Sequence, residues 1–128
     1  MQPRRMTDTS RFAAKLLFQY RVGKPANSKF RICEERIVVL RKNTPESALS
    51  EANRIGESSQ TDFLNDEGET VAIEFVGVLD LMNLGLESEP NEVWYEIKTM
   101  LRPVERRKKL IPPKEKLSAF RIDRVRLD

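Results

Sequence analysis

Histidine is absent from the sequence, and this absence excludes more chemistry than any motif adds. A chain without histidine cannot assemble a Ser-His-Asp or Cys-His catalytic set. The only cysteine, Cys33, cannot form a disulfide within the chain, and one cysteine without histidine cannot make a zinc site of the usual nitrogen and sulfur ligands. We therefore expect no cofactor and no such metal site. Only an ion held by carboxylates, such as Mg²⁺, Mn²⁺ or Ca²⁺, remains open.

Glycine and long apolar runs are also scarce. The five glycines stand singly, so the sequence contains no glycine-rich loop of the kind that cradles a nucleotide phosphate. No run approaches the roughly 18 apolar residues of a membrane span, and "MQPRRMTDTSR" at the N-terminus is not followed by the apolar stretch of a secretory signal. We expect a soluble cytoplasmic protein with one core, because 128 residues with 34% charged side chains suit a single domain.

Two strands are predicted near the N-terminus. Apolar residues occupy every even position from Phe12 to Val22, which is the period of a half-buried strand. The loop "GKPANSK" follows, then a second strand from about Phe30 to Arg41, and an antiparallel hairpin is the simplest connection. The apolar pattern of this second strand changes phase across residues 34–36. Either a bulge there shifts it, or both faces are buried at residues 38–40.

A helix is predicted over residues 45–55. Thr44 suits the N-cap, Pro45 suits the first helical position, and Gly56 is placed to end the helix. Its apolar residues share one face at helical spacing: Ala48, Leu49, Ala52 and Ile55. Glu46 in the first turn would repel an anion, so we interpret the helix as scaffold.

The central part of the sequence predicts more strands. A short strand and a polar turn around Gly68 precede a strong strand over about Thr70 to Leu81, which is apolar on both faces and so belongs inside a sheet. In "VWYEIKTML", residues 93–98 alternate as a further strand would, although Met100 and Leu101 also allow a helix. The fold class is therefore α+β, with a mostly antiparallel sheet of four to five strands and the helix packed on one face.

The chain divides by character into three parts. Residues 1–10 are expected to be a disordered N-terminus, and residues 11–101 a single α+β domain. Residues 102–128 form an extended basic segment whose prolines interrupt any helix, and its apolar residues lead us to expect that it docks on its own domain or on another chain.

Four segments together resemble a known family: "AAKLLFQYRV", "CEERIVVLRKNTPESALSEANRIG", "GETVAIEFVGVLDL" and "EVWYE". The family comprises small bacterial proteins and is known as domain of unknown function 4288. The similarity covers about residues 11–101, and "EERIVVL" and "GETVAIEFVGVLD" are its most specific parts. The resemblance implies a compact α+β domain, and it brings no established activity, catalytic residue or cofactor that could be carried over to this chain. The segment after Leu101 departs from the family pattern.

Charge is distributed unevenly along the chain. Residues 102–128 hold ten Lys and Arg against four Asp and Glu, whereas no basic residue lies between Arg54 and Lys98. The acidic middle could dock a basic protein, and the basic end could lie on another chain. We predict a non-enzymatic protein-binding or regulatory module that binds a protein partner or forms a homo-oligomer. The predicted binding surface comprises Asp66, Glu67, Glu69, Arg106, Arg107, Lys108, Lys109 and Phe120.

Two alternatives remain open. The basic tail could bind nucleic acid through phosphate contacts, although Phe120 is its only aromatic residue. Alternatively, Asp80 followed by Glu96 and Lys98 is similar to the Asp, then Glu-x-Lys pattern of restriction-type nucleases. In that reading the two carboxylates would hold Mg²⁺ and the lysine would help to activate water. The pattern is short, and Glu-x-Lys on a strand usually forms a solvated face.

Overall fold

The computed structural model describes residues 10–23, 31–85 and 91–120. The chain forms two units, residues 1–95 and residues 96–128. The predicted disordered N-terminus falls almost entirely on residues 1–9, which lie outside the described residues.

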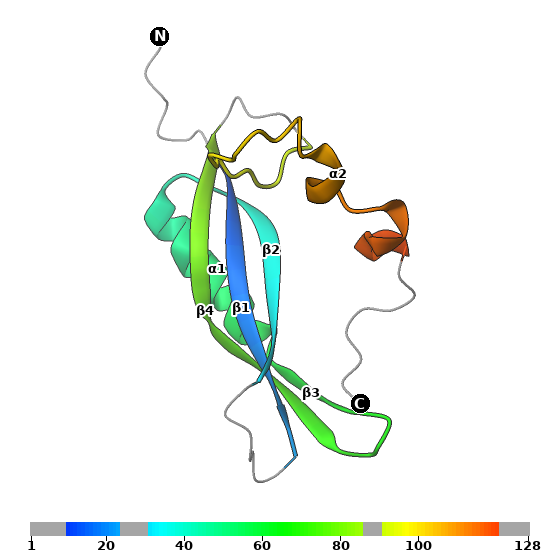
Figure 1. The fold of residues 1–128 in the computed structure, drawn as a ribbon. Coiled ribbons are helices and arrows are strands. Elements are labelled where there is room, and N and C mark those ends of the chain that lie inside the picture. Colours follow the sequence, from blue (N-terminus) through cyan, green and yellow to red (C-terminus); the bar gives the residue numbers. More distant parts are fainter. Residues whose placement is uncertain (1–9, 24–30, 86–90, 121–128) are drawn as a thin grey trace. The chain divides into compact units, whose positions relative to one another are not determined.

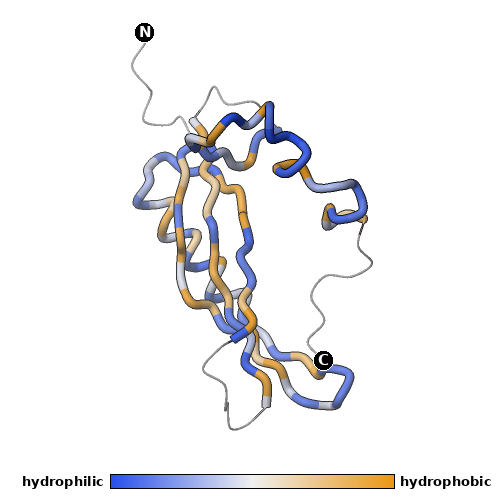
Figure 2. The backbone as a smooth tube through the Cα atoms, viewed as in Figure 1, coloured by the Kyte–Doolittle hydropathy of each residue, from blue (hydrophilic) through white to orange (hydrophobic). Residues whose placement is uncertain are grey.

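The first unit is a four-stranded antiparallel sheet with one helix (Figure 1). Its elements are β1 (Ser10–Val22), β2 (Ile32–Lys42), α1 (Pro45–Ser58), β3 (Thr61–Leu64) and β4 (Thr70–Gly85). The strand order is β2-β1-β4-β3, so β1 and β4 lie inside the sheet while β2 and β3 form its edges. This confirms the α+β prediction and the central position of the strand that is apolar on both faces. Figure 2 shows hydrophobic and hydrophilic residues alternating along the strands and α1.

The core lies between α1 and one face of the sheet, here called the helix face. β1 contributes Phe12, Ala14, Leu16 and Phe18, all of which are at most 1% exposed. Ala48 and Ala52 of α1 are fully buried against them, because their small side chains let the helix approach the sheet closely. The strict alternation of β1 therefore places its even-numbered residues beneath the helix.

α1 begins as predicted and ends later than predicted. The Thr44 side chain accepts a hydrogen bond from the Ser47 backbone N–H at 3.1 Å, and Pro45 occupies the first turn. Gly56 does not end the helix, which continues to Ser58. Instead, Gly56 is buried where a Cβ atom would overlap the Phe75 ring, so the absence of a side chain serves packing.

β2 contains no bulge, which corrects one of the two explanations offered for its pattern. Its pairing with β1 runs without interruption from Tyr20 opposite Ile32 to Ser10 opposite Lys42. The alternative, burial of both faces, is also wrong because Val39 is 43% exposed. The even-numbered residues of β2 lie on the helix face, and they are apolar at Val38 and Leu40 but polar at Arg36 and Glu34. The apolar pattern therefore changes phase where the core ends.

The bulges lie in β4 instead. Its pairing with β1 shifts at three places, and Val76, Leu79 and Leu84 have no partner on β1 in the register. Each extra residue bends a strand and increases its twist, so the bulges curl the sheet.

Among its described residues, 96–120, the second unit contains only short helical segments. They are α2 (Arg107–Leu110), η1 (Lys114–Lys116) and η2 (Ser118–Phe120). The strand predicted over residues 93–98 is wrong, because residues 92–100 have no regular secondary structure and the two units divide after Tyr95. Alternation alone did not make a strand, since a strand also requires a neighbour for its backbone hydrogen bonds. Among the described residues, no helix is long and apolar enough to cross a membrane.

Candidate functional site

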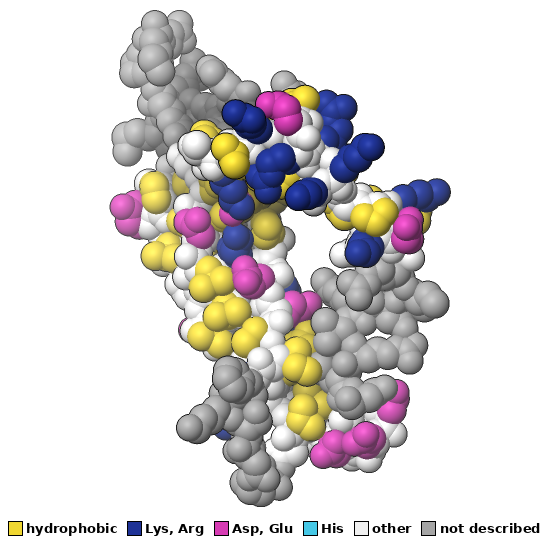
Figure 3. All heavy atoms as spheres, in the orientation of Figure 1, with side chains coloured by type: hydrophobic (Ala, Val, Ile, Leu, Met, Phe, Trp, Pro, Cys, Tyr) yellow, Lys and Arg dark blue, Asp and Glu magenta, His cyan; other side chains and the backbone are white. Residues whose placement is uncertain are grey.

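The sheet face turned away from α1, here called the open face, carries exposed apolar side chains. Ala13, Lys15 and Leu17 of β1 point to it, because they alternate with the buried even-numbered residues. β2 adds Ile37 and Val39, which pair with Lys15 and Ala13 and are each 43% exposed. Figure 3 shows hydrophobic side chains gathered over the strands.

Two bulge residues of β4 add to the exposed apolar surface of the sheet. Val76 is 57% exposed and Leu79 is 50% exposed, and neither belongs to the cluster beneath α1. Gly77, between them, has nothing within 4 Å of the position that a Cβ atom would take. The bulge residues Val76 and Leu79 therefore stay exposed, while their neighbours Phe75 and Val78 pack against the core.

Residues 91–95 cross one end of the open face. Arg11 donates a hydrogen bond from Nη2 to the carbonyl oxygen of Glu92 at 3.1 Å. The Lys15 ammonium lies 4.7 Å from the centroid of the Trp94 ring, within the range of a cation–π contact. The Trp94 Nε1 is buried without an acceptor among the described residues. This crossing accounts for part of the burial at the start of β1.

Sequence reasoning missed the open face. The run "RIVVLR" was interpreted through a bulge or through two buried faces, and neither interpretation leaves Ile37 and Val39 exposed. A signal was present, because a strand that is apolar on both sides must either lie inside a sheet or meet a partner. Strand order was needed to decide between these possibilities.

A cluster of polar side chains lies at the end of the helix face, next to Phe18. Glu34 Oε1 accepts hydrogen bonds from the Tyr20 hydroxyl and from Arg36 Nε, both at 2.8 Å, and the contact with Arg36 is also an ion pair. The Arg36 guanidinium lies 4.1 Å from the centroid of the Phe18 ring. Partial burial raises the pKa of Tyr20 above its ordinary value, and the adjacent Glu34 raises it further. Glu35 points to the opposite face, so the two glutamates do not form a carboxylate pair.

The predicted acidic residues come together on the turn between β3 and β4, here called the acidic turn (residues 65–69). Asn65 Oδ1 accepts hydrogen bonds from the backbone N–H groups of Glu67 and Glu69, at 3.0 and 2.9 Å. Gly68 adopts a φ of 79°, which favours glycine. These contacts order the turn. Asp66, Glu67 and Glu69 are exposed, and Glu69 Oε1 also accepts a hydrogen bond from Asn65 Nδ2 at 3.3 Å.

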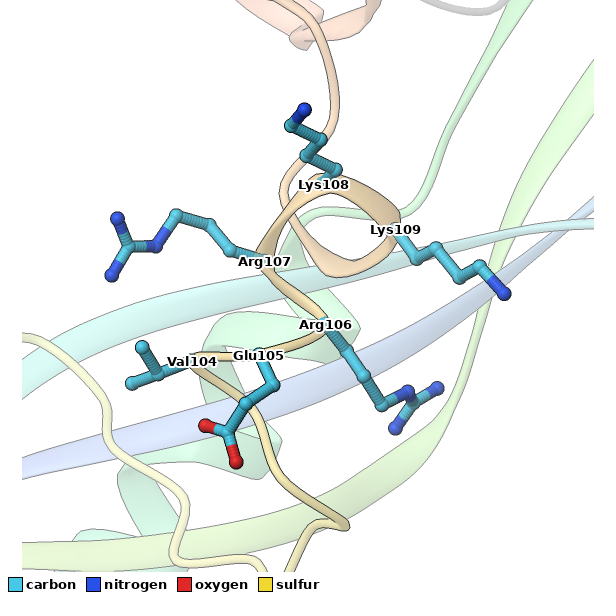
Figure 4. A pocket seen from close by; sticks show the side chains of 6 residues that line it. All are labelled: Val104, Glu105, Arg106, Arg107, Lys108 and Lys109. Atoms are coloured by element: carbon cyan, nitrogen blue, oxygen red, sulfur yellow. The ribbon is translucent and has the colours of Figure 1, made fainter.

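The predicted basic residues lie in the second unit, on residues 106–109, here called the basic turn. Residues 104–109 line a hollow, but Figure 4 shows the four cationic side chains fanning out in different directions. They do not converge on a common point, so the turn displays charge without forming an anion pocket. Phe120, also predicted, is 56% exposed, and the Lys114 ammonium lies 5.2 Å from the centroid of its ring.

The residues of the nuclease alternative are divided between the units. Asp80 belongs to β4, and its Oδ1 accepts a hydrogen bond from the Leu81 backbone N–H at 2.8 Å. Glu96 and Lys98 belong to the second unit, outside any strand, and form an ion pair at 3.3 Å. Within either unit of the described residues, no three Asp, Glu or Cys side chains lie together as a metal ion would require.

A family model matches residues 11–94, which is well over half of the chain, under the description Domain of unknown function (DUF4288). The chain belongs to the DUF4288 family. This confirms the resemblance that the sequence motifs suggested. No curated protein and no solved structure matches the chain.

The family match includes some of the candidate binding surfaces and excludes others. The DUF4288 domain, residues 11–94, includes α1, nearly all of the sheet, the acidic turn and Trp94 on the open face. The basic turn and Phe120 lie outside it. The open face and the edge strand β2 are therefore features of the DUF4288 domain itself, whereas the basic turn belongs to the segment that follows.

Proposed function

We propose that this DUF4288 domain is a non-enzymatic protein-binding module whose first partner is a second copy of the same chain. The observation that supports the proposal is the edge strand β2, which among the described residues pairs with β1 alone. Its 11 residues present a row of backbone N–H and C=O groups on the other side. Proteins usually blunt such an edge with proline, a bulge, a short strand or charged side chains. β2 has none of the first three, and its charged residues flank a central apolar stretch, residues 37–40.

The side chains of β2 favour the same conclusion. Ile37 and Val39 are exposed on the open face, next to the unpaired edge. A strand added along this edge would satisfy the backbone groups and cover both side chains at once. Backbone pairing and apolar burial then act together, which is the usual basis of strand addition.

The charged turns extend the proposal to partners of other chemistry. The acidic turn is ordered by its own hydrogen bonds, so it offers three carboxylates to a basic protein without an entropic cost for folding the loop. Its charge would chiefly accelerate association. We place the module in the cytoplasm, where the exposed thiol of Cys33 would stay reduced.

Nucleic acid is the second candidate partner, and the basic turn favours it. Its four consecutive cations are exposed and point in different directions (Figure 4), which suits phosphate contacts and not the reading of bases. We expect weak DNA binding that falls steeply with salt and is reduced by Lys108→Glu with Lys109→Glu, measured by fluorescence anisotropy of a labelled duplex. Binding unchanged in this variant would remove the basic turn from consideration.

Self-association is tested by sedimentation equilibrium of the full chain over a wide concentration range. We expect the wild type to reach the mass of two chains, and Ile37→Glu to stay near the mass of one. The Ile37→Glu variant should keep its fold because Lys15 lies opposite on β1.

The matched control is Leu49→Glu, because Leu49 is also 43% exposed but lies on α1. It should dimerise as the wild type does. A wild type that keeps the mass of one chain at every concentration would contradict the proposal.

A further inference from the structure

We infer that two copies join edge to edge through antiparallel β2 strands, with a twofold axis at Val38, and that Glu35 of each copy forms an ion pair with Arg41 of the other. The inference rests on the self-association proposed above. It goes beyond that proposal by naming the register, the axis and the residues that select them.

Backbone geometry restricts the possible registers. In an antiparallel ladder, the N–H and C=O groups of every second residue point to the same side of the strand. Two identical strands related by a twofold axis must bring outward-pointing residues opposite outward-pointing residues. The axis must therefore pass through a residue of β2, and never between two residues.

The charges of β2 select one residue for the axis. The strand carries acids near its start and bases at its end: Glu34 and Glu35, then Arg41 and Lys42. With the axis at Val38, Glu35 lies opposite Arg41 of the second copy, and Glu34 lies opposite Lys42. Because of the twofold symmetry each of these pairs occurs twice.

Registers centred on the neighbouring residues lose this complementarity. With the axis at Ile37, Glu35 would lie opposite Val39 of the second copy, leaving both acids without a basic residue opposite. With the axis at Val39, Arg36 would lie opposite Lys42, which places like charges together. Directly opposed unlike charges stabilise a pair of strands and like charges destabilise it, so the register at Val38 is favoured over both.

The ion pair that favours this register, between Glu35 and Arg41 of the second copy, lies on the open face. Glu35 and Arg41 are both exposed and lie on the open face, on either side of Ile37 and Val39. In the proposed register Ile37 lies opposite Val39 of the second copy, so an apolar seam is flanked by an ion pair at each end. Glu34 is already hydrogen bonded within its own chain, and we therefore assign it the smaller part.

The joined edges would make one continuous sheet from two four-stranded sheets. Residues opposite each other in a ladder share a face, so both α1 helices would lie on one side and both open faces on the other. The exposed apolar residues of the two copies would then form a single surface.

A charge exchange tests the register. Glu35→Arg alone and Arg41→Glu alone each turn two attractive pairs into repulsive ones, and each should weaken its own dimer by about tenfold or more. An equimolar mixture of the two variants should form a heterodimer, because every opposed pair is again of unlike charge. The measurement is sedimentation equilibrium of each variant and of the mixture, one chain carrying a fluorescent label.

The control is Glu57→Arg, which makes the same change of charge at an exposed site on α1 and should leave the dimer unchanged. Thermal unfolding of each variant shows whether the fold is intact.

Disulfide trapping supplies a second readout that does not depend on charge. In a Cys33→Ser background, a mixture of Ile37→Cys and Val39→Cys chains should cross-link across the seam much faster than either alone. Directly opposed strand residues have Cα atoms about 5 Å apart, within reach of a disulfide.

The outcomes separate the inference from the proposed function. A wild type that never dimerises overturns both. A wild type that dimerises while the charge-exchanged mixture fails to associate and the cysteine mixture fails to cross-link overturns the register alone. Recovery of the heterodimer together with selective cross-linking supports both.

Discussion

The two faces of the sheet differ in how completely the chain buries its apolar residues. On the helix face, β1 and α1 enclose four side chains that are at most 1% exposed, and an arginine and a tyrosine close the end of the layer. On the open face, Ile37 and Val39 remain 43% exposed, and the bulge residue Leu79 of β4 is 50% exposed. The same strands therefore form a complete core on one side and an incomplete one on the other.

The difference shows which face of the sheet the chain itself covers and which face it leaves exposed. A sheet with a helix on one side is a sufficient two-layer fold, so the open face does not have to be apolar for stability. Apolar residues there cost solubility unless a partner covers them. Under the proposed function, the helix face serves stability and the open face, with the β2 edge, serves association.

The difference between buried and exposed apolar residues is tested most directly by truncating one large side chain of each kind. Phe18→Ala should lower the free energy of unfolding by about 3–5 kcal/mol, because Phe18 is fully buried and packs on Phe75 with ring centroids 5.4 Å apart. Leu79→Ala, on the exposed side, should change it by about 0.5 kcal/mol or less. Urea denaturation monitored by circular dichroism measures both.

Equal losses in the two variants would mean that the exposed bulge of β4 contributes to stability as much as the core beneath α1 does. Because Phe18→Ala could unfold the chain outright, Phe18→Leu serves as the milder change. It should still cost clearly more than Leu79→Ala.

A smaller effect on stability is expected from substituting two glycines, of which Gly56 is closely packed and Gly77 is not. Gly56→Ala should cost about 1–3 kcal/mol, because the added methyl group would overlap the Phe75 ring in a closely packed layer. Gly77→Ala should be neutral or slightly stabilising, since its new Cβ atom meets nothing within 4 Å. Thermal unfolding of both variants measures the difference, and a neutral Gly56→Ala would contradict the packing account.

Much of the fold could be predicted from local patterns. The period of two over residues 12–22 and the Thr44–Pro45 start of α1 are short-range signals, and both are confirmed. The failures depended on contacts between distant residues. Gly56 was interpreted as a helix end because its packing against Phe75 depends on tertiary structure. The strand over residues 93–98 failed because alternation does not reveal whether a neighbouring strand exists.

The candidate site was less predictable than the fold. Charged clusters can be read directly, and the acidic residues Asp66, Glu67 and Glu69 do lie on one exposed turn. The open face could not be read in the same way, because exposure of Ile37 and Val39 depends on β2 being an edge strand and on α1 covering only one side. Strand order is a long-range property, so no local pattern in "RIVVLR" reveals it.

The smallest predicted effect concerns the polar end of the helix face and depends on pH. Burial first, and then the hydrogen bond to Glu34, raise the pKa of Tyr20 above its ordinary value of 10.0 in the folded chain. The folded state therefore holds this proton more tightly than the unfolded state does. The resulting stability is fully present below the unfolded pKa and is lost as the pH rises through the folded pKa.

Tyr20→Phe removes both the hydrogen bond, at a cost of about 1 kcal/mol near neutral pH, and this alkaline dependence. The difference in unfolding free energy between wild type and Tyr20→Phe should hold steady up to about pH 10 and shrink above it. Tyr95→Phe, at a side chain that is 48% exposed, is the control and should keep the alkaline loss of the wild type. If Tyr20→Phe lost stability above pH 10 as steeply as Tyr95→Phe, the alkaline loss would not come from Tyr20. The Tyr20–Glu34 hydrogen bond would then not stabilise the polar end of the helix face.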